Sequence, residues 1–397
     1  MLKIAIWLHH VPQWVVHRVA GAAMRKQAFQ VSVRSFPRWL DELQGLRRSW
    51  DARGVSGAAT VAEQAFVFDI DGVLRKGKRT LPQAQEALRK LYTEDRSRPK
   101  FPLCFLTNGG GVSESTKAKQ LTDWLGVNVA PDQVVLAHTP MRDLVPRLAD
   151  SPVLLSGRGT VKSVASEYGF KKTVTTEELG RAMPTATPFS SYPSLDGEGG
   201  RICPVRGDGL GTQSNPFKAV LVFTDPSDWA RDLQLIVDVV MSGGVPGRVK
   251  LPPGSAPVEV FFSHADLLWA NDFPAPRFGQ GAFSLAFESL YKATTGKSAP
   301  VTCFGKPTPS PYRLAEKLLM KQVPPHLHNS TQHPPFSRIY MIGDNPAADV
   351  RGARNAKHPW VSVLVKTGVF SKDEINSKED PADIVADDVL EFVKSVV

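Results

Sequence analysis

The stretch FVFDIDGVL, residues 66–74, determines how the rest of the chain is interpreted, because an apolar run leads directly into two carboxylates, Asp69 and Asp71. Such a run is typical of a buried strand in a parallel sheet, and Gly72 indicates that the strand ends there. In open parallel sheets, ligands bind just beyond the carboxyl ends of the strands. The two carboxylates therefore form the first candidate site of the chain.

Length and composition limit the classes of protein to which the chain can belong. The chain has 397 residues, of which 42% are hydrophobic, so it can bury a full core and is expected to hold two structural units. It contains no run of about 18 apolar residues, so we expect no membrane span. Its three cysteines, Cys104, Cys203 and Cys303, are far apart and lack CxxC spacing, so neither a disulfide framework nor a zinc site is expected.

Positive charge is concentrated at the start of the chain. Residues 1–64 carry nine Lys or Arg and four acidic residues, which is +5 of the net charge of +9, and the first 40 residues contain no Asp or Glu. A basic, acid-free stretch with intermittent apolar residues resembles a mitochondrial presequence, and we expect no nucleic acid partner. Low serine content and the pair His9 and His10 leave an alternative open, a leader without a targeting role in a cytoplasmic protein.

Short apolar runs alternate with longer periodic segments from residue 65 onward, which predicts an α/β fold with a Rossmann-like parallel sheet flanked by helices. AFVFDI and FPLCFLTN are expected as early strands of this sheet, and RIYMIGDN and WVSVLVKTG as late ones. A second α/β series lies between them and is interpreted as an inserted cap domain. We expect a leader at residues 1–64, core segments at 65–135 and 301–397, the cap at 136–300, and a flexible, Pro- and Gly-rich insert at 181–216.

Polar side chains follow three of the predicted core strands. Asp69 and Asp71 follow the first, Thr107 and Asn108 the second, and the pair Asp344 and Asn345 the third. Because parallel strands end at the same edge of a sheet, we expect these side chains to converge. Carboxylates held close together need a cation between them, and Mg²⁺ is favoured because it takes carboxylate oxygens, waters and a substrate phosphate.

A phosphate group also needs positive partners. Lys306 in FGKPTPS is fixed on one side by Pro307, Thr107 can donate a hydroxyl, and the backbone N–H groups of NGGG can approach an anion closely. Each signal alone has an ordinary interpretation, as a surface charge, a turn or a tight loop. Their presence together, each beside a strand end or a helix start, favours a phosphate site.

With these residues in view, the chain resembles the haloacid dehalogenase-like hydrolases. FDIDGVL, FLTNGG, GKP and MIGDNPAAD look like the four motifs of that family, in order. The large α/β cap between the second and third motifs looks like class IIA, the nitrophenyl-phosphatase type. TNGGG, HTPMRDL and NDFPAPRFGQGAF look like the Cat eye syndrome critical region protein 5-like branch, in its fungal form.

The resemblance implies a mechanism through an aspartyl-phosphate and assigns a role to each motif residue. Asp69 would be the nucleophile, and Asp71 the general acid and base, with its backbone carbonyl on Mg²⁺. The implied catalytic residues are Asp69, Asp71 and Lys306, the substrate-binding residues Thr107, Asn108 and Gly109, the metal ligands Asp69, Asp71 and Asp344, and the supporting residues Asp349 and Asn345.

The function implied is an Mg²⁺-dependent phosphatase that hydrolyses a small phosphorylated metabolite, with a link to mitochondrial glycerophospholipid metabolism and a homodimer formed through the cap. Asp71 favours a phosphatase, since dehalogenases of this superfamily lack the second acid. The alternative from a different class is a non-catalytic or weakly active phosphate-binding or scaffold protein at mitochondria.

Three other patterns are given ordinary interpretations. SGRGTVKSVASEYG, residues 156–169, lacks the third glycine of a dinucleotide site and is expected to be a turn in the cap. HLHNSTQH lies in a Pro-rich stretch and is expected to be a solvated loop rather than a metal site. NDFPAPRFGQGAF departs from the Asn-Pro-Asp spacing common in class IIA, yet Asn271, Asp272 and Arg277 within it are candidates to lie over the site.

Overall fold

The computed structural model describes residues 64–192, 209–249, 251, 253–255, 257–324, 336–370 and 373–397. The predicted leader, the central part of the predicted flexible insert and the histidine-rich stretch fall on residues 1–63, 193–208 and 325–335, which lie outside the described residues. The described residues belong to one compact unit, Ala59–Val397. None of its helices in the described ranges is both long and apolar enough to cross a membrane.

The larger sheet has six strands, all parallel, in the order β15-β14-β13-β1-β4-β5. The first strand of the chain, β1, lies at the centre between β13 and β4. Asp69, Thr107 and Asp344 follow these three adjacent strands, so the sheet brings them to one edge. The strands are β1 (Gln64–Phe68), β4 (Leu103–Leu106), β5 (Val134–Val135), β13 (Arg338–Gly343), β14 (Trp360–Val365) and β15 (Ile384–Ala386).

Helices cover both faces of this sheet. Successive side chains along each strand point to opposite faces, so the apolar side chains of each face need their own covering layer. Phe66 and Phe68 of β1 join the apolar cluster of α3, α4 and α13, whereas Val67 joins the cluster of α11 and α12. Burial on both faces explains why FVF contains no polar residue. The helices are α3 (Pro82–Leu91), α4 (Glu114–Leu125), α11 (Pro309–Lys321), α12 (Arg351–Ala356) and α13 (Val389–Val396).

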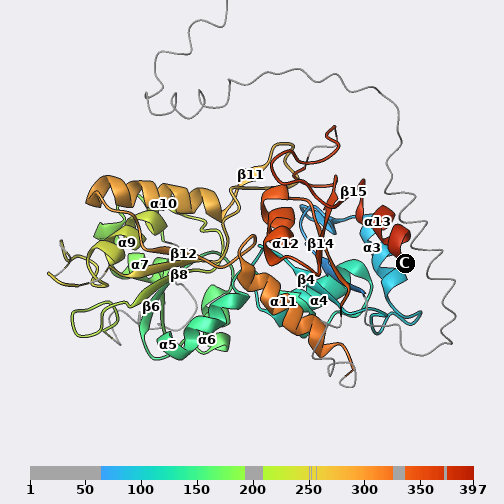
Figure 1. Cartoon of the computed structure of the whole chain (residues 1–397). Helices are drawn as coiled ribbons and strands as arrows, with labels where there is room; N and C mark the ends of the chain where they lie inside the picture. The colour runs from blue at the N-terminus through green and yellow to red at the C-terminus, as the bar shows by residue number, and fades with distance from the viewer. Residues whose placement is uncertain are drawn as a thin grey trace, which may run out of the picture. The chain divides into compact units, whose positions relative to one another are not determined.

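The second sheet has five parallel strands in the order β12-β9-β8-β6-β7. Helices α9 and α10 lie beside each other against it (Figure 1). The predicted α/β class with parallel sheets is therefore confirmed. The elements are β6 (Pro152–Ser156), α6 (Val161–Tyr168), β7 (Lys172–Thr175), α7 (Thr176–Ala182), β8 (Ala219–Val222), α9 (Trp229–Met241), β9 (Glu259–Phe262), α10 (Gln280–Thr295) and β12 (Val301–Cys303).

Two details differ from the sequence-based expectation. Val301–Cys303, which we assigned to the second core segment, pairs with β9 in the second sheet. A strand of only three residues cannot indicate which of two parallel sheets it joins, so the expected boundary at residue 301 lies too early. The predicted flexible insert also begins too early, since α7 runs to Ala182 and Pro184–Ala186 forms a 3-10 turn, η4.

Shorter elements complete the described chain. Two short β-hairpins contact each other. The backbone nitrogen of Lys78, in the turn of one hairpin, lies 3.4 Å from a carboxylate oxygen of Asp272, in the loop of the other. The first pairs β2 (Arg75–Lys76) with β3 (Arg79–Thr80), and the second pairs β10 (Leu268–Trp269) with β11 (Arg277–Phe278). The remaining turns are η2 (Pro131–Gln133), η3 (Thr139–Leu144), α5 (Val145–Leu148) and the π-helical turn η6 (Pro346–Val350).

A buried polar network lies beneath the NGGG loop. A hydrogen bond of 2.8 Å joins Nδ1 of His138 to the hydroxyl of Tyr168, and that hydroxyl donates to Glu114 at 2.7 Å. Glu114 also accepts from the hydroxyl of Thr139 and pairs with Arg142 at 3.0 Å. Tyr168 belongs to α6 and Glu114 to α4, so the network ties a helix of the second sheet to a helix of the first.

The state of His138 predicts how stability depends on pH. Burial of the ring, partly offset by the charge of Glu114, lowers the pKa of His138 from 6.5 to about 4. Between these values the unfolded chain binds a proton that the folded chain does not, so stability is fully present above pH 6.5 and declines as the pH falls. We expect the free energy of unfolding to fall by about 2 kcal/mol more in the native protein than in His138→Gln between pH 7 and pH 5.

Urea denaturation of both proteins across this pH range measures the difference. Tyr168→Phe serves as the control, because it removes the hydrogen bond but leaves the buried ring, and should keep the excess pH dependence. Parallel pH profiles for the native protein and His138→Gln would contradict a buried, neutral His138.

Candidate active site

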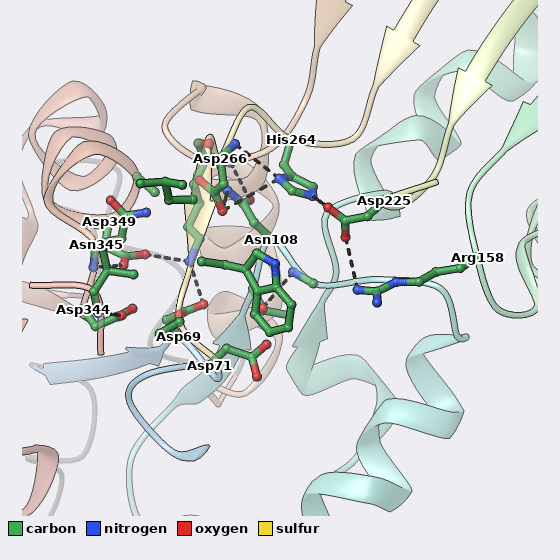
Figure 2. A pocket seen from close by; sticks show the side chains of 18 residues that line it. Asp69, Asp71, Asn108, Arg158, Asp225, His264, Asp266, Asp344, Asn345 and Asp349 are labelled. Carbon is green, nitrogen blue, oxygen red and sulfur yellow. Dashed lines mark hydrogen bonds and ion pairs between the residues drawn. The ribbon is translucent and has the colours of Figure 1, made fainter. Parts of the chain in front are cut away.

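All nine residues predicted from the motifs line one cavity of about 90 Å³. They come from the carboxyl ends of β1, β4 and β13 and from the segment after β12 (Figure 2). The residues that the structure brings together are Asp69, Asp71, Thr107, Asn108, Gly109, Lys306, Asp344, Asn345 and Asp349.

Lys306 is the central positive charge of the cavity. Its Nζ donates to Asp349 at 2.6 Å, to Asp69 at 2.8 Å and to the carbonyl of Leu106 at 3.1 Å, so its three N–H bonds meet three acceptors. Burial opposes the charge, but Asp349 and Asp69 outweigh it and raise the pKa of Lys306 well above its usual value. The ammonium group is therefore permanently charged and fixed in place.

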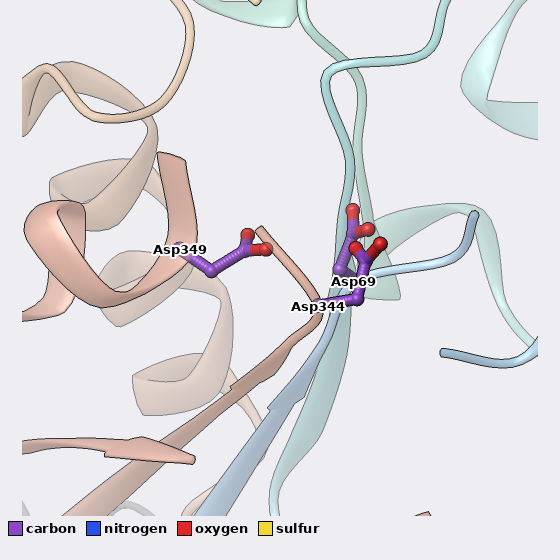
Figure 3. Close-up of side chains that lie close together, drawn as sticks. All are labelled: Asp69, Asp344 and Asp349. Carbon is purple, nitrogen blue, oxygen red and sulfur yellow. The ribbon is translucent and has the colours of Figure 1, made fainter. Parts of the chain in front are cut away.

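Three buried carboxylates gather around this ammonium group. Oxygens of Asp69, Asp344 and Asp349 lie within 4.8 Å of one another (Figure 3). When all three are ionised, three carboxylates against one ammonium leave two negative charges, and the ligand atoms are all oxygens, so the set fits a hard divalent cation. Burial, followed by the charge of Asp349, raises the pKa of Asp344 to about 7, and a bound cation would relieve this.

The carboxylate cluster contains Asp349 where the expected ligand set has Asp71, but that set used Asp71 only through its backbone carbonyl. The side chain of Asp71 points away from Asp69 and Asp344 (Figure 2), and the third carboxylate of the cluster belongs to Asp349. Asn345 holds Asp349 in place, since its backbone N–H donates to that carboxylate at 3.0 Å. The expected contribution of Asp71 to a metal, through its backbone carbonyl, stays a prediction.

Asp71 occupies a separate position suited to proton transfer. Burial raises the pKa of its carboxyl group, partly offset by the charges of Lys117 and Arg75. A raised pKa keeps a larger fraction of the carboxyl group protonated near neutral pH, which a general acid requires. Burial also raises the pKa of Asp69, and the charge of Lys306 opposes that rise, so the two carboxylates of FVFDIDGVL differ in that only Asp69 is paired with Lys306.

The sequence suggested that Asn108 of the TNGG loop binds substrate. In the structure its side chain forms hydrogen bonds to other protein groups. Its Nδ2 donates to Asp266 at 2.9 Å and to the carbonyl of Lys306, and its Oδ1 accepts the backbone N–H of Lys306 at 2.9 Å. The side chain thus positions Lys306 and the second sheet, which leaves the backbone for a ligand. Thr107 accepts the N–H of Gly109 at 2.9 Å and keeps its own hydroxyl hydrogen to donate.

Sequence reasoning missed the part of the cavity that the second sheet contributes. Arg158, Asp225, His264 and Asp266 line it, and they follow strands β6, β8 and β9. The signal was present, since VFTD and FFSHAD place polar residues directly after apolar strands, as FVFDID does. The SGRG segment forms a turn, as expected. It contacts the NGGG loop, because the backbone N–H of Thr160 donates to the carbonyl of Gly111 at 2.9 Å.

The hairpin of β10 and β11 contributes different residues from those expected. Asn271, Asp272 and Arg277 do not line the cavity. Leu268, Trp269 and Ala270, which precede them in the chain, form an apolar part of its wall.

Comparisons with known proteins agree with the order of the motifs. Residues 66–171 match the family model described as haloacid dehalogenase-like hydrolase, and residues 303–392 match one described as HAD-hydrolase-like. A mitochondrial hydrolase of Saccharomyces cerevisiae is 36% identical over 345 residues, which cover 83% of this chain and 94% of that protein.

A second relative is longer than this chain. It is a cardiolipin synthase (CMP-forming) / mitochondrial hydrolase fusion protein of Schizosaccharomyces pombe, 36% identical over 341 residues. These cover 85% of this chain and 54% of the fusion protein, so the chain spans about half the length of that relative.

Solved structures share the fold at low sequence identity. A 4-nitrophenylphosphatase from Thermotoga maritima has a TM-score of 0.53 and 19% identity, over 85% of this chain and 98% of that one. A hypothetical protein from Pyrococcus horikoshii has a TM-score of 0.55 and 18% identity, over 84% and 99% respectively. These two comparisons concern the fold alone.

Glycine at position 72 is predicted to be essential for the carboxylate cluster. Gly72 has φ of 90°, and a Cβ added there would overlap the carboxylate of Asp344. We expect Gly72→Ala to lower the free energy of unfolding by about 3 kcal/mol or more and to weaken binding of a divalent cation, because both the backbone and Asp344 must shift.

Gly126→Ala is the matched control for this substitution. Gly126 ends α4 with φ of 68°, but a Cβ there meets nothing within 4 Å, so only the backbone cost of about 1 kcal/mol is expected. Urea denaturation and titration calorimetry with the cation measure both effects. Equal losses in the two variants would contradict the role of Gly72.

Proposed function

Because the chain belongs to the haloacid dehalogenase-like hydrolases, we propose that it is an Mg²⁺-dependent phosphatase that hydrolyses a small phosphorylated metabolite. One observation carries the proposal. A buried carboxylate, Asp69, is held by Lys306 at 2.8 Å, while the side chain of Asp71, two residues later, lines the same cavity outside that pair. This arrangement supplies a nucleophile and a separate proton donor.

Asp69 and Asp344, with the backbone carbonyl of Asp71, would hold Mg²⁺, and Asp349 would support the site. When bound, the cation supplies positive charge beside the phosphoryl group. The surplus of two negative charges around Lys306 supports a divalent cation.

In the first step, a carboxylate oxygen of Asp69 attacks phosphorus, and the bond from phosphorus to the leaving oxygen breaks. Asp71 gives its proton to that oxygen, so the product leaves as an alcohol. Lys306 keeps Asp69 oriented, and the hydroxyl of Thr107 can donate to a phosphoryl oxygen. Fixed donors of this kind stabilise charge where it develops during phosphoryl transfer.

In the second step, the carboxylate of Asp71 takes a proton from water, and the resulting hydroxide attacks phosphorus. The bond between Asp69 and phosphorus breaks, which releases inorganic phosphate and restores both carboxyl groups. The covalent route divides one difficult displacement into two easier ones. We propose that the second sheet and its helices act as a cap that limits substrate size, since they supply one side of a cavity of about 90 Å³.

We propose that the protein acts at mitochondria. Both relatives are named mitochondrial hydrolases, and the first 40 residues are basic and free of acids. The fusion of one relative to a cardiolipin synthase supports a place in glycerophospholipid metabolism. N-terminal sequencing of the protein recovered from fractionated cells tests the location, and an intact Met1 in the cytosol would overturn it.

Substitution of the nucleophile tests the activity. We expect the full-length protein to release phosphate from p-nitrophenyl phosphate and small phosphate esters only when Mg²⁺ is present. Asp69→Asn should lower the rate roughly 10³-fold or more, because the amide cannot form the covalent intermediate. Absence of Mg²⁺-dependent release above the Asp69→Asn background would favour the alternative, a phosphate-binding protein without turnover.

Asp71→Asn separates the two carboxylates. With alkyl phosphates the loss should be about 10²-fold or more, because the leaving alkoxide needs a proton. With p-nitrophenyl phosphate the first step needs no proton donor, so a rapid burst of p-nitrophenolate should precede slow turnover. Equal slowing of the first step with both classes of ester would contradict the role of Asp71.

A further inference from the structure

One carboxylate oxygen on the wall supplied by the second sheet has no partner. Oδ1 of Asp225 is buried without a hydrogen bond, and Asp225 lines the cavity. A buried carboxylate oxygen without a donor is costly, so such atoms in folded proteins need an explanation. The other oxygen, Oδ2, pairs with Arg158 at 3.3 Å.

A neighbouring histidine, His264, points a ring nitrogen toward this oxygen (Figure 2). Nδ1 of His264 accepts the backbone N–H of Asp266 at 3.3 Å, so the proton of the neutral ring lies on Nε2. Nε2 is 3.9 Å from Oδ1 of Asp225, which is too long for a hydrogen bond. An oxygen atom about 2.8 Å from each would bridge them, and the buried Oδ1 would turn toward the cavity to meet it.

We propose that Asp225 and His264 bind a hydroxyl group of the leaving alcohol, so that the preferred substrates are phosphate esters of small polyols or sugars. This assignment rests on the proposed phosphatase function and specifies its substrate class. The hydroxyl would donate to Oδ1 of Asp225 and accept from Nε2 of His264, which satisfies both protein atoms. Both residues follow strands of the second sheet and line the cavity that also contains Asp69 and Lys306.

The charges around this subsite favour a neutral hydroxyl over an ammonium or a second anion. Arg158 already pairs with Asp225, and burial raises the pKa of the other nearby carboxyl group, Asp266, which weakens its attraction for an ammonium group. An ammonium group also has no lone pair to accept the N–H of His264. A second anionic group would meet Oδ1 of Asp225 and the buried carboxyl group of Asp266.

The rest of the wall fits a short carbon chain. Leu268, Trp269 and Ala270 provide apolar surface beside the polar pair. A cavity of about 90 Å³ holds a phosphoryl group and a few additional atoms, so a larger leaving group such as p-nitrophenol would extend beyond it. A three-carbon polyol phosphate is therefore a suitable probe.

Two esters with the same carbon chain test the subsite. We expect kcat/KM for sn-glycerol 3-phosphate to exceed that for propyl phosphate at least about tenfold in the native full-length protein, because a site built for a hydroxyl rejects the analogue that lacks it. In Asp225→Ala this ratio should fall to near one, since the carboxylate that accepts the hydroxyl hydrogen is gone.

Asp238→Asn is the matched control, because Asp238 is a partly exposed carboxylate in α9 that bonds to Gln234 and does not line the cavity. It should preserve the ratio. 3-Aminopropyl phosphate tests the ammonium alternative, and a higher kcat/KM for it than for sn-glycerol 3-phosphate would overturn the assignment of a hydroxyl.

The outcomes separate the two proposals. Release from p-nitrophenyl phosphate, combined with equal kcat/KM for the glycerol and propyl esters in the native protein, would overturn the subsite alone, whether or not Asp225→Ala folds. No release from any ester, p-nitrophenyl phosphate included, would overturn the phosphatase function and the subsite with it. If Asp225→Ala keeps the native ratio of kcat/KM for the glycerol and propyl esters, other residues recognise the hydroxyl, and the proposal is wrong.

Discussion

The pairing of Lys306 with two buried carboxylates is the interaction on which the rest of the site depends. Removing charges from water is costly unless opposite charges and hydrogen bonds replace the solvent, and Lys306 meets this condition through Asp69, Asp349 and one carbonyl. Asp344 is left without an equivalent partner, and its raised pKa reflects that. The protein therefore neutralises only part of its own negative charge, which is the condition for retaining a divalent cation.

Glycine residues leave the space that the carboxylates of this cluster need. Gly72 and Gly368 lie against Asp344, and Gly343 lies against Asp349, at distances that exclude a Cβ. A similar close approach joins the two sheets, because the turn at Gly159 sits on the backbone of Gly111. The glycine-rich segments of the sequence therefore act mainly in packing, and they allow both sheets to direct their strand ends into one cavity.

The sequence predicted the core of the site better than its wall, for a physical reason. Asp69, Thr107 and Asp344 directly follow long apolar strands, so their positions depend only on the order of neighbouring parallel strands. Asp225 and His264 have the same local signal, but their distance from the motifs depends on how the second sheet sits on the first, which no local pattern encodes. The use of Asn108 as a support for Lys306, and the pairing of Val301–Cys303 with the second sheet, likewise depend on tertiary contacts.

If Asp69 is the nucleophile, it carries the phosphoryl group during turnover. Trapping the phosphorylated protein tests this role most directly. The full-length Asp71→Asn protein would be mixed with p-nitrophenyl phosphate and Mg²⁺, quenched in acid during the burst, and analysed by peptide mass spectrometry. We expect one phosphoryl group on the peptide that contains Asp69, and none when Asp69→Asn is combined with Asp71→Asn. A phosphoryl group on another residue, or phosphate release with no covalent adduct at any time point, would contradict it.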